Sequence, residues 1–204
     1  MNLTFNEAQL AAEAAKLSPQ LRVVFAAACA ERLLPAYERF SRQTGRGDLP
    51  KLRGILNRLW DDVAGSPMTA AEIQSNIDAA LQLTPAEDDG PWVPEQAAAE
   101  DAGAATAYAL RCRQSGKGQE AAWAARRAYE ALDHFVIAQE KLDVNAPGAE
   151  ARVLKHPLVQ AELQRQKRDL SELLVADKNT AKPSAAQFRA RAATEARGVF
   201  GGAS

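Results

Sequence analysis

The stretch that decides the fold runs Leu21-Arg-Val-Val-Phe-Ala-Ala-Ala-Cys-Ala-Glu-Arg-Leu-Leu-Pro-Ala-Tyr-Glu-Arg-Phe40. Its apolar side chains recur every three or four residues, the period of an α-helix with one side turned toward a core. A serine–proline pair precedes the stretch and a glycine follows it, which suits the start and the end of a helix. We therefore predict one long helix over 18–44, kinked near Leu33 because Pro35 cannot donate a backbone hydrogen bond.

The rest of the chain is also rich in helix-forming residues. Ala, Leu, Glu, Gln and Arg dominate, and no stretch alternates polar and apolar residues over the length of a strand. Thr4 with Glu7 and Thr69 with Glu72 are predicted capping boxes, and Asp48 is a predicted N-cap. We expect an all-α domain, a bundle-like array of about seven helices around one core. The predicted helices span 4–16, 18–44, 49–64, 69–83, 95–115, 117–142 and 156–176.

Two segments depart from the helical pattern. Residues 84–101 carry six acidic side chains and no basic one, with prolines that indicate a non-helical stretch. From residue 177 onward the chain turns basic, contains a proline and ends in Gly-Gly-Ala-Ser. We therefore predict a helical domain over 1–176 and a basic tail over 177–204 that is mobile or weakly helical.

Length and charge exclude several classes of protein. The chain has 204 residues, enough for one domain with a sizeable core, and a net charge of −1, which argues against a dedicated nucleic-acid binder. No apolar run approaches the roughly 18 residues of a membrane span, and the N-terminus lacks the pattern of a secretory signal. Two cysteines, Cys29 and Cys112, are too few for a disulfide framework, so we expect reduced thiols in a cytoplasmic protein.

Four polar side chains fall on or beside helix stripes that are otherwise apolar: Arg32, Asp101, Glu162 and Gln166. A buried charge without a partner costs several kcal/mol, so we expect Arg32 and Asp101 to pair, with Glu162 and Gln166 completing one buried cluster. Two roles stay open. The cluster sets the register of the helices, or its cation and carboxylate line a pocket for a small polar molecule. If kinks turn these residues into solvent, there is no cluster.

Residues that support metal or nucleophilic chemistry are sparse. The two histidines, His134 and His156, belong to no metal-ligand motif, and Cys29 lies among alanines that are typical of a core. We therefore assign no metal, no cofactor and no catalytic residue. The turn Gly45-Arg46-Gly47 is a candidate anion site because a guanidinium precedes a helix start; a role as cap and turn alone is the alternative.

Charge is unevenly distributed along the chain. Residues 18–58 hold eight basic and three acidic side chains, whereas residues 59–101 hold ten acidic and no basic ones. Such asymmetry favours pairing within the molecule or self-association. The basic 18–58 face, together with the tail, keeps weak nucleic-acid binding open as an alternative, and such binding would fall steeply with salt.

Several stretches share their pattern with one known family: residues 25–40, 44–48, 52–60, 100–102 and 156–162, with Gln166. They resemble the YjaG-like family of bacterial proteins, and the likeness covers residues 18–176. The resemblance implies an all-helical bacterial domain of unknown function, and gene neighbourhoods suggest a link to histidine-kinase signalling. It assigns no catalytic residue.

These features together predict a non-enzymatic interaction or regulatory module that binds a protein partner or a second copy of itself. The main alternative is a small-molecule binder, or an enzyme, that uses the Arg32/Asp101 cluster. The two differ in one observable. A ligand site needs a concave opening onto the cluster, whereas an interaction module has a closed polar core and an exposed apolar patch.

Overall fold

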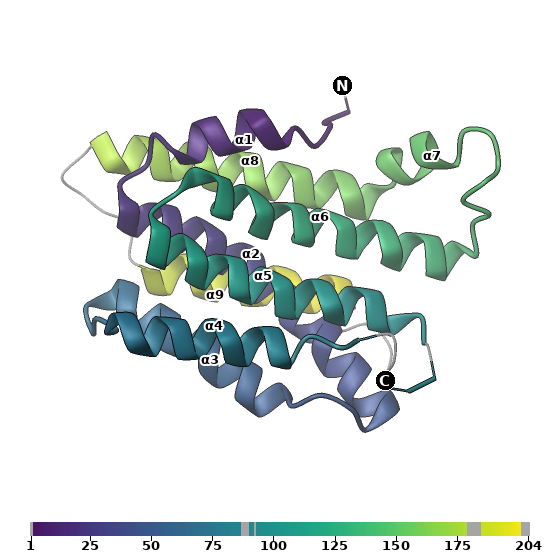
Figure 1. Cartoon of the computed structure of the whole chain (residues 1–204). Coiled ribbons are helices and arrows are strands. Elements are labelled where there is room, and N and C mark those ends of the chain that lie inside the picture. The colour runs from purple at the N-terminus through teal and green to yellow at the C-terminus, as the bar shows by residue number, and fades with distance from the viewer. Residues whose placement is uncertain (1, 87–89, 92, 179–184, 201–204) are drawn as a thin grey trace.

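A computed structural model describes residues 2–86, 90–91, 93–178 and 185–200, and this part of the chain contains helices and no strand. The all-α prediction is therefore confirmed. Its helices are α1 (Glu7–Ala14), α2 (Pro19–Thr44), α3 (Leu49–Ala64), α4 (Ala70–Gln82), α5 (Glu95–Ser115), α6 (Gly118–Glu140), α7 (Ala149–Lys155), α8 (Pro157–Lys178) and α9 (Ala185–Phe200). Helices α1, α6 and α8 lie on one side and α3 and α4 on the other, with α2 and α5 between them (Figure 1). No helix in the described ranges is long and apolar enough to cross a membrane.

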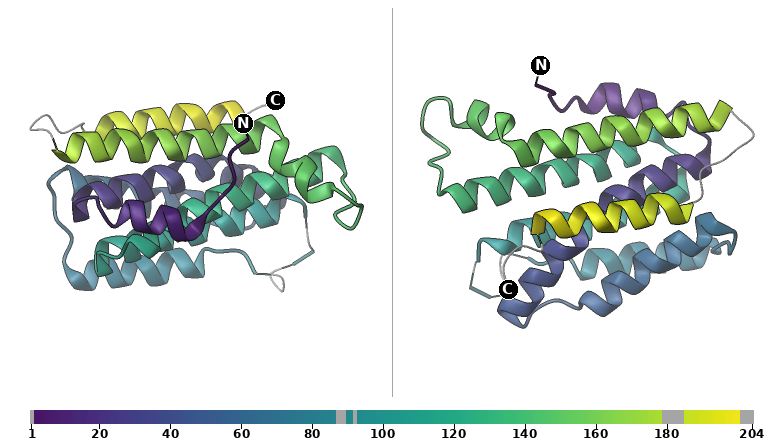
Figure 2. Two further views of the ribbon diagram at one scale, coloured as in Figure 1. Left: turned by 90° about the horizontal axis from the view of Figure 1, so that it is seen from above. Right: turned by 180° about the vertical axis from the view of Figure 1, so that it is seen from behind.

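Helix α2 runs through the centre of the molecule. Every residue from Leu21 to Leu34 is buried, because α5 covers one side of α2 and α9 the opposite side (Figures 1 and 2), while α3, α6 and α8 also pack against it. A helix enclosed in this way needs apolar residues all round, and the small side chains of residues 26–30 let its neighbours approach closely. The quoted stretch therefore decides the fold by supplying the central helix.

Capping residues set most helix ends as predicted. Asp48 caps α3, and Thr69 forms a capping box with Glu72 at α4. Gly45 ends α2 with a φ of +67°, a conformation that glycine adopts without strain. The exception is α1, which begins at Glu7 with Asn6 as its N-cap.

Three other features differ from the sequence prediction. The kink expected near Leu33 does not interrupt α2, which continues through Pro35 as one helix from Pro19 to Thr44. The short helix α7 lies in the connection between α6 and α8. Together with α9 it brings the number of helices in the described ranges to nine, where about seven were expected.

The segment expected as a mobile or weakly helical tail contains α9, which is packed into the domain. One side chain per turn of α9 is buried: Phe188, Ala192, Ala196 and Phe200. This row lies against α2, and α9 also contacts α3. The basic charge and the proline of this segment favour a tail, whereas the four-residue spacing of its apolar side chains favours a packed helix, and the structure follows the spacing. Expectations for residues 179–184 and 201–204 fall outside the described residues.

Candidate functional site

The central helix carries three buried charges, and each binds a different part of the fold. The first is Arg22, which donates to the carbonyl oxygens of Ala14 at 2.8 Å and Leu17 at 2.7 Å, at the end of α1. It also donates to the carbonyl of Gly116, just after α5. Carbonyl groups at helix C-termini carry partial negative charge, so the guanidinium stabilises both ends where they meet α2.

The second buried charge is Glu31, which faces α3 and α9. Its carboxylate accepts a hydrogen bond from Trp60 Nε1 at 3.0 Å and pairs with Arg53, while Arg189 Nε lies 4.0 Å away. Sequence analysis missed Glu31 because it lies beside the apolar stripe of α2, and its burial depends on α9. Its position in the sequence, directly before the predicted buried residue Arg32, is the feature that could have indicated its burial.

The third buried charge, Arg32, is the centre of a cluster with α8. Its Nη2 and Nε donate to Glu162 Oε1 at 2.9 and 3.1 Å, and its Nη1 donates to Asp169 Oδ2 at 2.9 Å. Gln166 Nε2 in turn donates to Glu162 Oε1 at 3.0 Å. All four side chains are 1–3% exposed. We call Arg32, Glu162, Gln166 and Asp169 the Arg32 cluster.

Asp101 is buried, as predicted, but it does not pair with Arg32. Its Oδ1 lies 3.2 Å from Arg127 Nη1 and its Oδ2 lies 3.3 Å from His134 Nδ1, both on α6. The predicted Arg32–Asp101 pair is therefore replaced by two separate clusters. A helix enclosed on all sides has several core-facing directions, so membership of a buried stripe does not determine which neighbour a side chain meets.

The space beside Arg32 and Glu162 is closed, whereas Gln166, at the other side of the Arg32 cluster, borders a cavity between α1 and α8. The cavity lined by Arg32, Glu162 and Arg165 has a volume of about 10 Å³, room for about one water molecule. Burial also raises the pKa of the Cys29 thiol next to it, so that thiol stays protonated. Within the described ranges no group of three or more His, Cys, Asp or Glu side chains is placed to hold a metal ion.

The Gly45-Arg46-Gly47 turn is built into contacts between α2 and α5. Arg46 Nη2 donates to Gln96 Oε1 at 2.9 Å, and its guanidinium lies 4.9 Å from the centre of the Phe40 ring. Gly47 has a φ of +77°, and a Cβ there would lie 2.7 Å from the Tyr37 hydroxyl. These contacts give the turn a structural role, and anion binding there stays a prediction.

Arginines gather along α9, where it meets α2 and α3. Near one end of α9, Arg39, Arg42 and Arg197 line a cavity of about 530 Å³ beside Phe200. Near the other end, Arg53 and Arg189 approach Glu31. We call these five arginines the arginine face.

Carboxylates partly neutralise these basic side chains. Arg39 pairs with Glu95 at 3.3 Å, and on α3 the neighbouring Arg58 pairs with Glu72 at 3.5 Å. Both pairs join the basic 18–58 segment to the acidic 59–101 segment, so part of the charge asymmetry of the sequence is resolved within the molecule.

Comparison with known proteins places this fold in a family. A family profile described as "Protein of unknown function (DUF416)" matches residues 9–196. The chain belongs to the DUF416 family. The match extends through α8 and most of α9, so the DUF416 region is longer than the core of 18–176 expected from the resemblance. The matched profile carries the DUF416 description and not the YjaG-like name.

A solved DUF416 structure has the same fold. The crystal structure of a DUF416 family protein from Shewanella baltica OS155 matches with a TM-score of 0.74 and 19% sequence identity, over 89% of this chain and 91% of that chain. No curated protein sequence matches the chain. The DUF416 relationship therefore supports the architecture and assigns no activity.

Proposed function

We propose that this protein is a non-enzymatic interaction module whose arginine face binds an acidic segment of a partner protein. The observation that carries the proposal is the cavity of about 530 Å³ where Arg39, Arg42 and Arg197 meet beside Phe200. The arginines come from helices near opposite ends of the chain, so only the folded domain assembles them. Guanidinium groups form paired hydrogen bonds with carboxylates, and arginine and aromatic residues are enriched at protein interfaces.

The closed space beside Arg32 and Glu162 supports an interaction role for the protein over a ligand-binding role for these two charges. A ligand that used Arg32 or Glu162 would have to occupy the space of about 10 Å³ beside them, which is far smaller than ligand pockets of roughly 300–1,000 Å³. Because its charges bind one another across α2 and α8, the Arg32 cluster is better suited to setting helix register.

The proposed recognition of a partner protein depends on charged side chains and not on an exposed apolar surface. The exposed apolar patch expected of an interaction module is not found on the described surface. Its large exposed apolar side chains lie apart from one another: Leu81 on α4, Val144 in the connection between α6 and α7, and Val175 on α8. A partner that supplies a few carboxylates therefore fits this molecule better than one that supplies an apolar helix.

The same arginines favour a protein partner over a nucleic acid. Arg42 pairs with Glu38, Arg39 with Glu95, and Arg53 with Glu31. These carboxylates lower the positive potential that a phosphate backbone needs along its whole length. A short acidic peptide needs only the cavity at Arg39, Arg42 and Arg197, where its carboxylates would take the place of Glu95 on Arg39 and of Glu38 on Arg42.

A charge-reversal experiment tests the proposal. The double variant Arg42→Glu/Arg197→Glu changes two exposed side chains of the cavity, and Lys16→Glu/Lys155→Glu makes the same charge change at exposed positions away from it. We expect the wild type and the control to capture the same proteins from a bacterial lysate at low salt, and the Arg42/Arg197 variant to lose them. Histidine-kinase signalling proteins, which the family resemblance suggests, are the first to test by purified binding.

Two further measurements separate the alternatives. If sedimentation shows an oligomer that the Arg42/Arg197 variant abolishes, the partner is a second copy of the chain. If the wild type instead binds duplex DNA with steep salt dependence and the variant does not, the nucleic-acid alternative replaces the proposal. Capture that is unchanged by the variant contradicts the proposal outright.

A further inference from the structure

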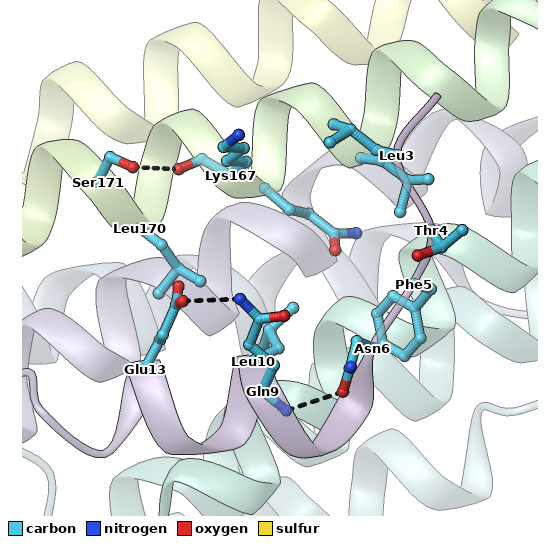
Figure 3. A pocket seen from close by; sticks show the side chains of 12 residues that line it. Leu3, Thr4, Phe5, Asn6, Gln9, Leu10, Glu13, Lys167, Leu170 and Ser171 are labelled. Carbon is cyan, nitrogen blue, oxygen red and sulfur yellow. Dashed lines mark hydrogen bonds between the residues drawn. The ribbon is translucent and has the colours of Figure 1, made fainter. Parts of the chain in front are cut away.

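A second cavity lies between α1 and α8, away from the arginine face, and has a volume of about 270 Å³ (Figure 3). Leu3, Phe5 and Leu10 form its wall on the side of α1, and Leu163 and Leu170 form its wall on α8. We call this cavity the α1–α8 groove. Its walls are mainly apolar, so it suits the aliphatic part of a ligand.

The groove exists because α1 packs on α6 and stands off from α8. Gly118 at the start of α6 lies so close to α1 that a Cβ there would be 2.5 Å from the carbonyl oxygen of Ala11. The extended residues before α1 are tied to α8 instead, since Leu3 N donates to Gln160 Oε1 at 2.8 Å and Gln160 Nε2 donates to the Leu3 carbonyl at 2.9 Å. These two attachments keep the walls apart.

One buried polar atom among the groove residues has no partner. Gln166, which lines the groove, is 2% exposed, and its Nε2 donates to the Ala125 carbonyl at 2.9 Å and to Glu162 at 3.0 Å. Both of those partners are acceptors, so the amide nitrogen must point toward them and the oxygen must point away. That oxygen, Oε1, is buried without a hydrogen bond. A buried carbonyl oxygen without a hydrogen bond is unfavourable, so a ligand that supplies a hydrogen-bond donor to it would be stabilised.

The polar groups around the groove restrict the charge of a ligand. An anionic head group would meet the Gln166 oxygen, which is an acceptor and repels it. An ammonium group would bring three donors to that single neutral acceptor and would lose its hydration shell. At the rim, Glu13 and Lys167 carry opposite charges and select neither sign.

We propose that the α1–α8 groove binds a small neutral amphipathic molecule. Its aliphatic body lies against the leucines of α1 and α8. Its hydroxyl or amide N–H donates a hydrogen bond to Gln166 Oε1 once this side chain shifts toward the groove, because the oxygen is closed to solvent before binding. This site is independent of the arginine face, and its occupation does not require the proposed partner.

Two six-carbon probes with one oxygen atom each, of which only one can donate a hydrogen bond, test this proposal. The hydroxyl of 1-hexanol donates a hydrogen bond, whereas the carbonyl of 2-hexanone only accepts one. Titration of each into the full-length protein, followed by chemical shifts of the backbone amides of α1 and α8, gives two dissociation constants. We expect 1-hexanol to bind about tenfold more tightly, because the ketone leaves Oε1 unpaired.

Variants assign the preference to Gln166. Gln166→Met should bring the two dissociation constants within about twofold of each other, since the acceptor that separates them is gone. Gln164→Met makes the same change at an exposed position of α8 and should keep the full preference. Because Gln166→Met also removes the contacts to Ala125 and Glu162, Leu10→Trp serves as a second test that leaves Gln166 in place. It should fill the groove and weaken both probes together.

The proposal is overturned if neither probe binds the wild type up to its solubility, which would mean that the groove holds water only. It is equally overturned if the two probes bind the wild type alike, or if the preference for 1-hexanol survives in Gln166→Met.

Discussion

Asp101 on α5 and His134 on α6 face each other, with 3.3 Å between Asp101 Oδ2 and His134 Nδ1. The carboxylate is buried, while the imidazole is almost half exposed. Arg127 approaches the other carboxylate oxygen, so Asp101 holds two side chains of α6 at once. The contact with Asp101 raises the pKa of His134 above its ordinary value.

This pair makes stability depend on pH. Because the pKa of His134 is higher in the folded state, the pair stabilises the fold fully below the ordinary histidine pKa of about 6.5 and loses this effect as pH rises through the raised value. Exposure of the imidazole limits the contribution to about 1 kcal/mol or less. We expect the difference in unfolding free energy between wild type and His134→Gln, measured in urea from pH 5.5 to 8.5, to shrink with pH. A constant difference contradicts the assignment.

Both cysteines should be unreactive in the folded protein. Burial raises the pKa of Cys112 to about 12 and that of Cys29 well above its usual range, so neither forms a thiolate near neutral pH. We expect Ellman's reagent to modify both thiols at once in urea, and to modify the native protein only as fast as it unfolds. Rapid modification of one thiol under native conditions would show that its surroundings are open.

Helix α9 should contribute strongly to stability. Phe188 is 3% exposed in the packed row of α9, and the Arg191 guanidinium lies 4.5 Å from its ring centre. Phe188→Ala should therefore lower the unfolding free energy by about 3–5 kcal/mol. Thr194→Ala, at an exposed position of the same helix, should change it by less than about 0.5 kcal/mol. Equal, small effects in denaturant titrations would mean that residues 185–200 are a loosely attached tail.

The sequence predicts this fold best where capping residues and an apolar stripe agree. Helix α3 is the clearest case, because Asp48 marks its start and Leu52, Leu56 and Leu59 form its buried side. Helix α9 is harder to predict because its arginines lie between its buried positions, which gives the segment the composition of a solvated tail. The composition of this segment predicts a tail and the spacing of its apolar residues predicts a helix, and the helix is what the structure contains.

The partners of the buried charges were harder to predict than their burial. The stripe of α8 contains Glu162, Gln166 and Asp169 at helical spacing, so Asp169 could have been found in the sequence as a second acceptor for Arg32. That α8 rather than α5 faces Arg32 depends on how five helices surround α2. The unpartnered oxygen of Gln166 depends on α1 packing against α6, which no local pattern specifies.

The central claim is that buried charges join α2 to its neighbours, and a double-mutant cycle between Arg32 and Glu162 tests it most directly. Unfolding free energies would be measured for Arg32→Met, Glu162→Met and the double variant. Arg32→Met takes from Glu162 its cation at 2.9 Å, and Glu162→Met leaves Arg32 with Asp169 as its only carboxylate. Each single change should cost at least about 2 kcal/mol, and the double variant should cost at least about 1 kcal/mol less than the sum of the two. Additive costs below about 1 kcal/mol each would contradict the claim, because they would place both side chains in solvent.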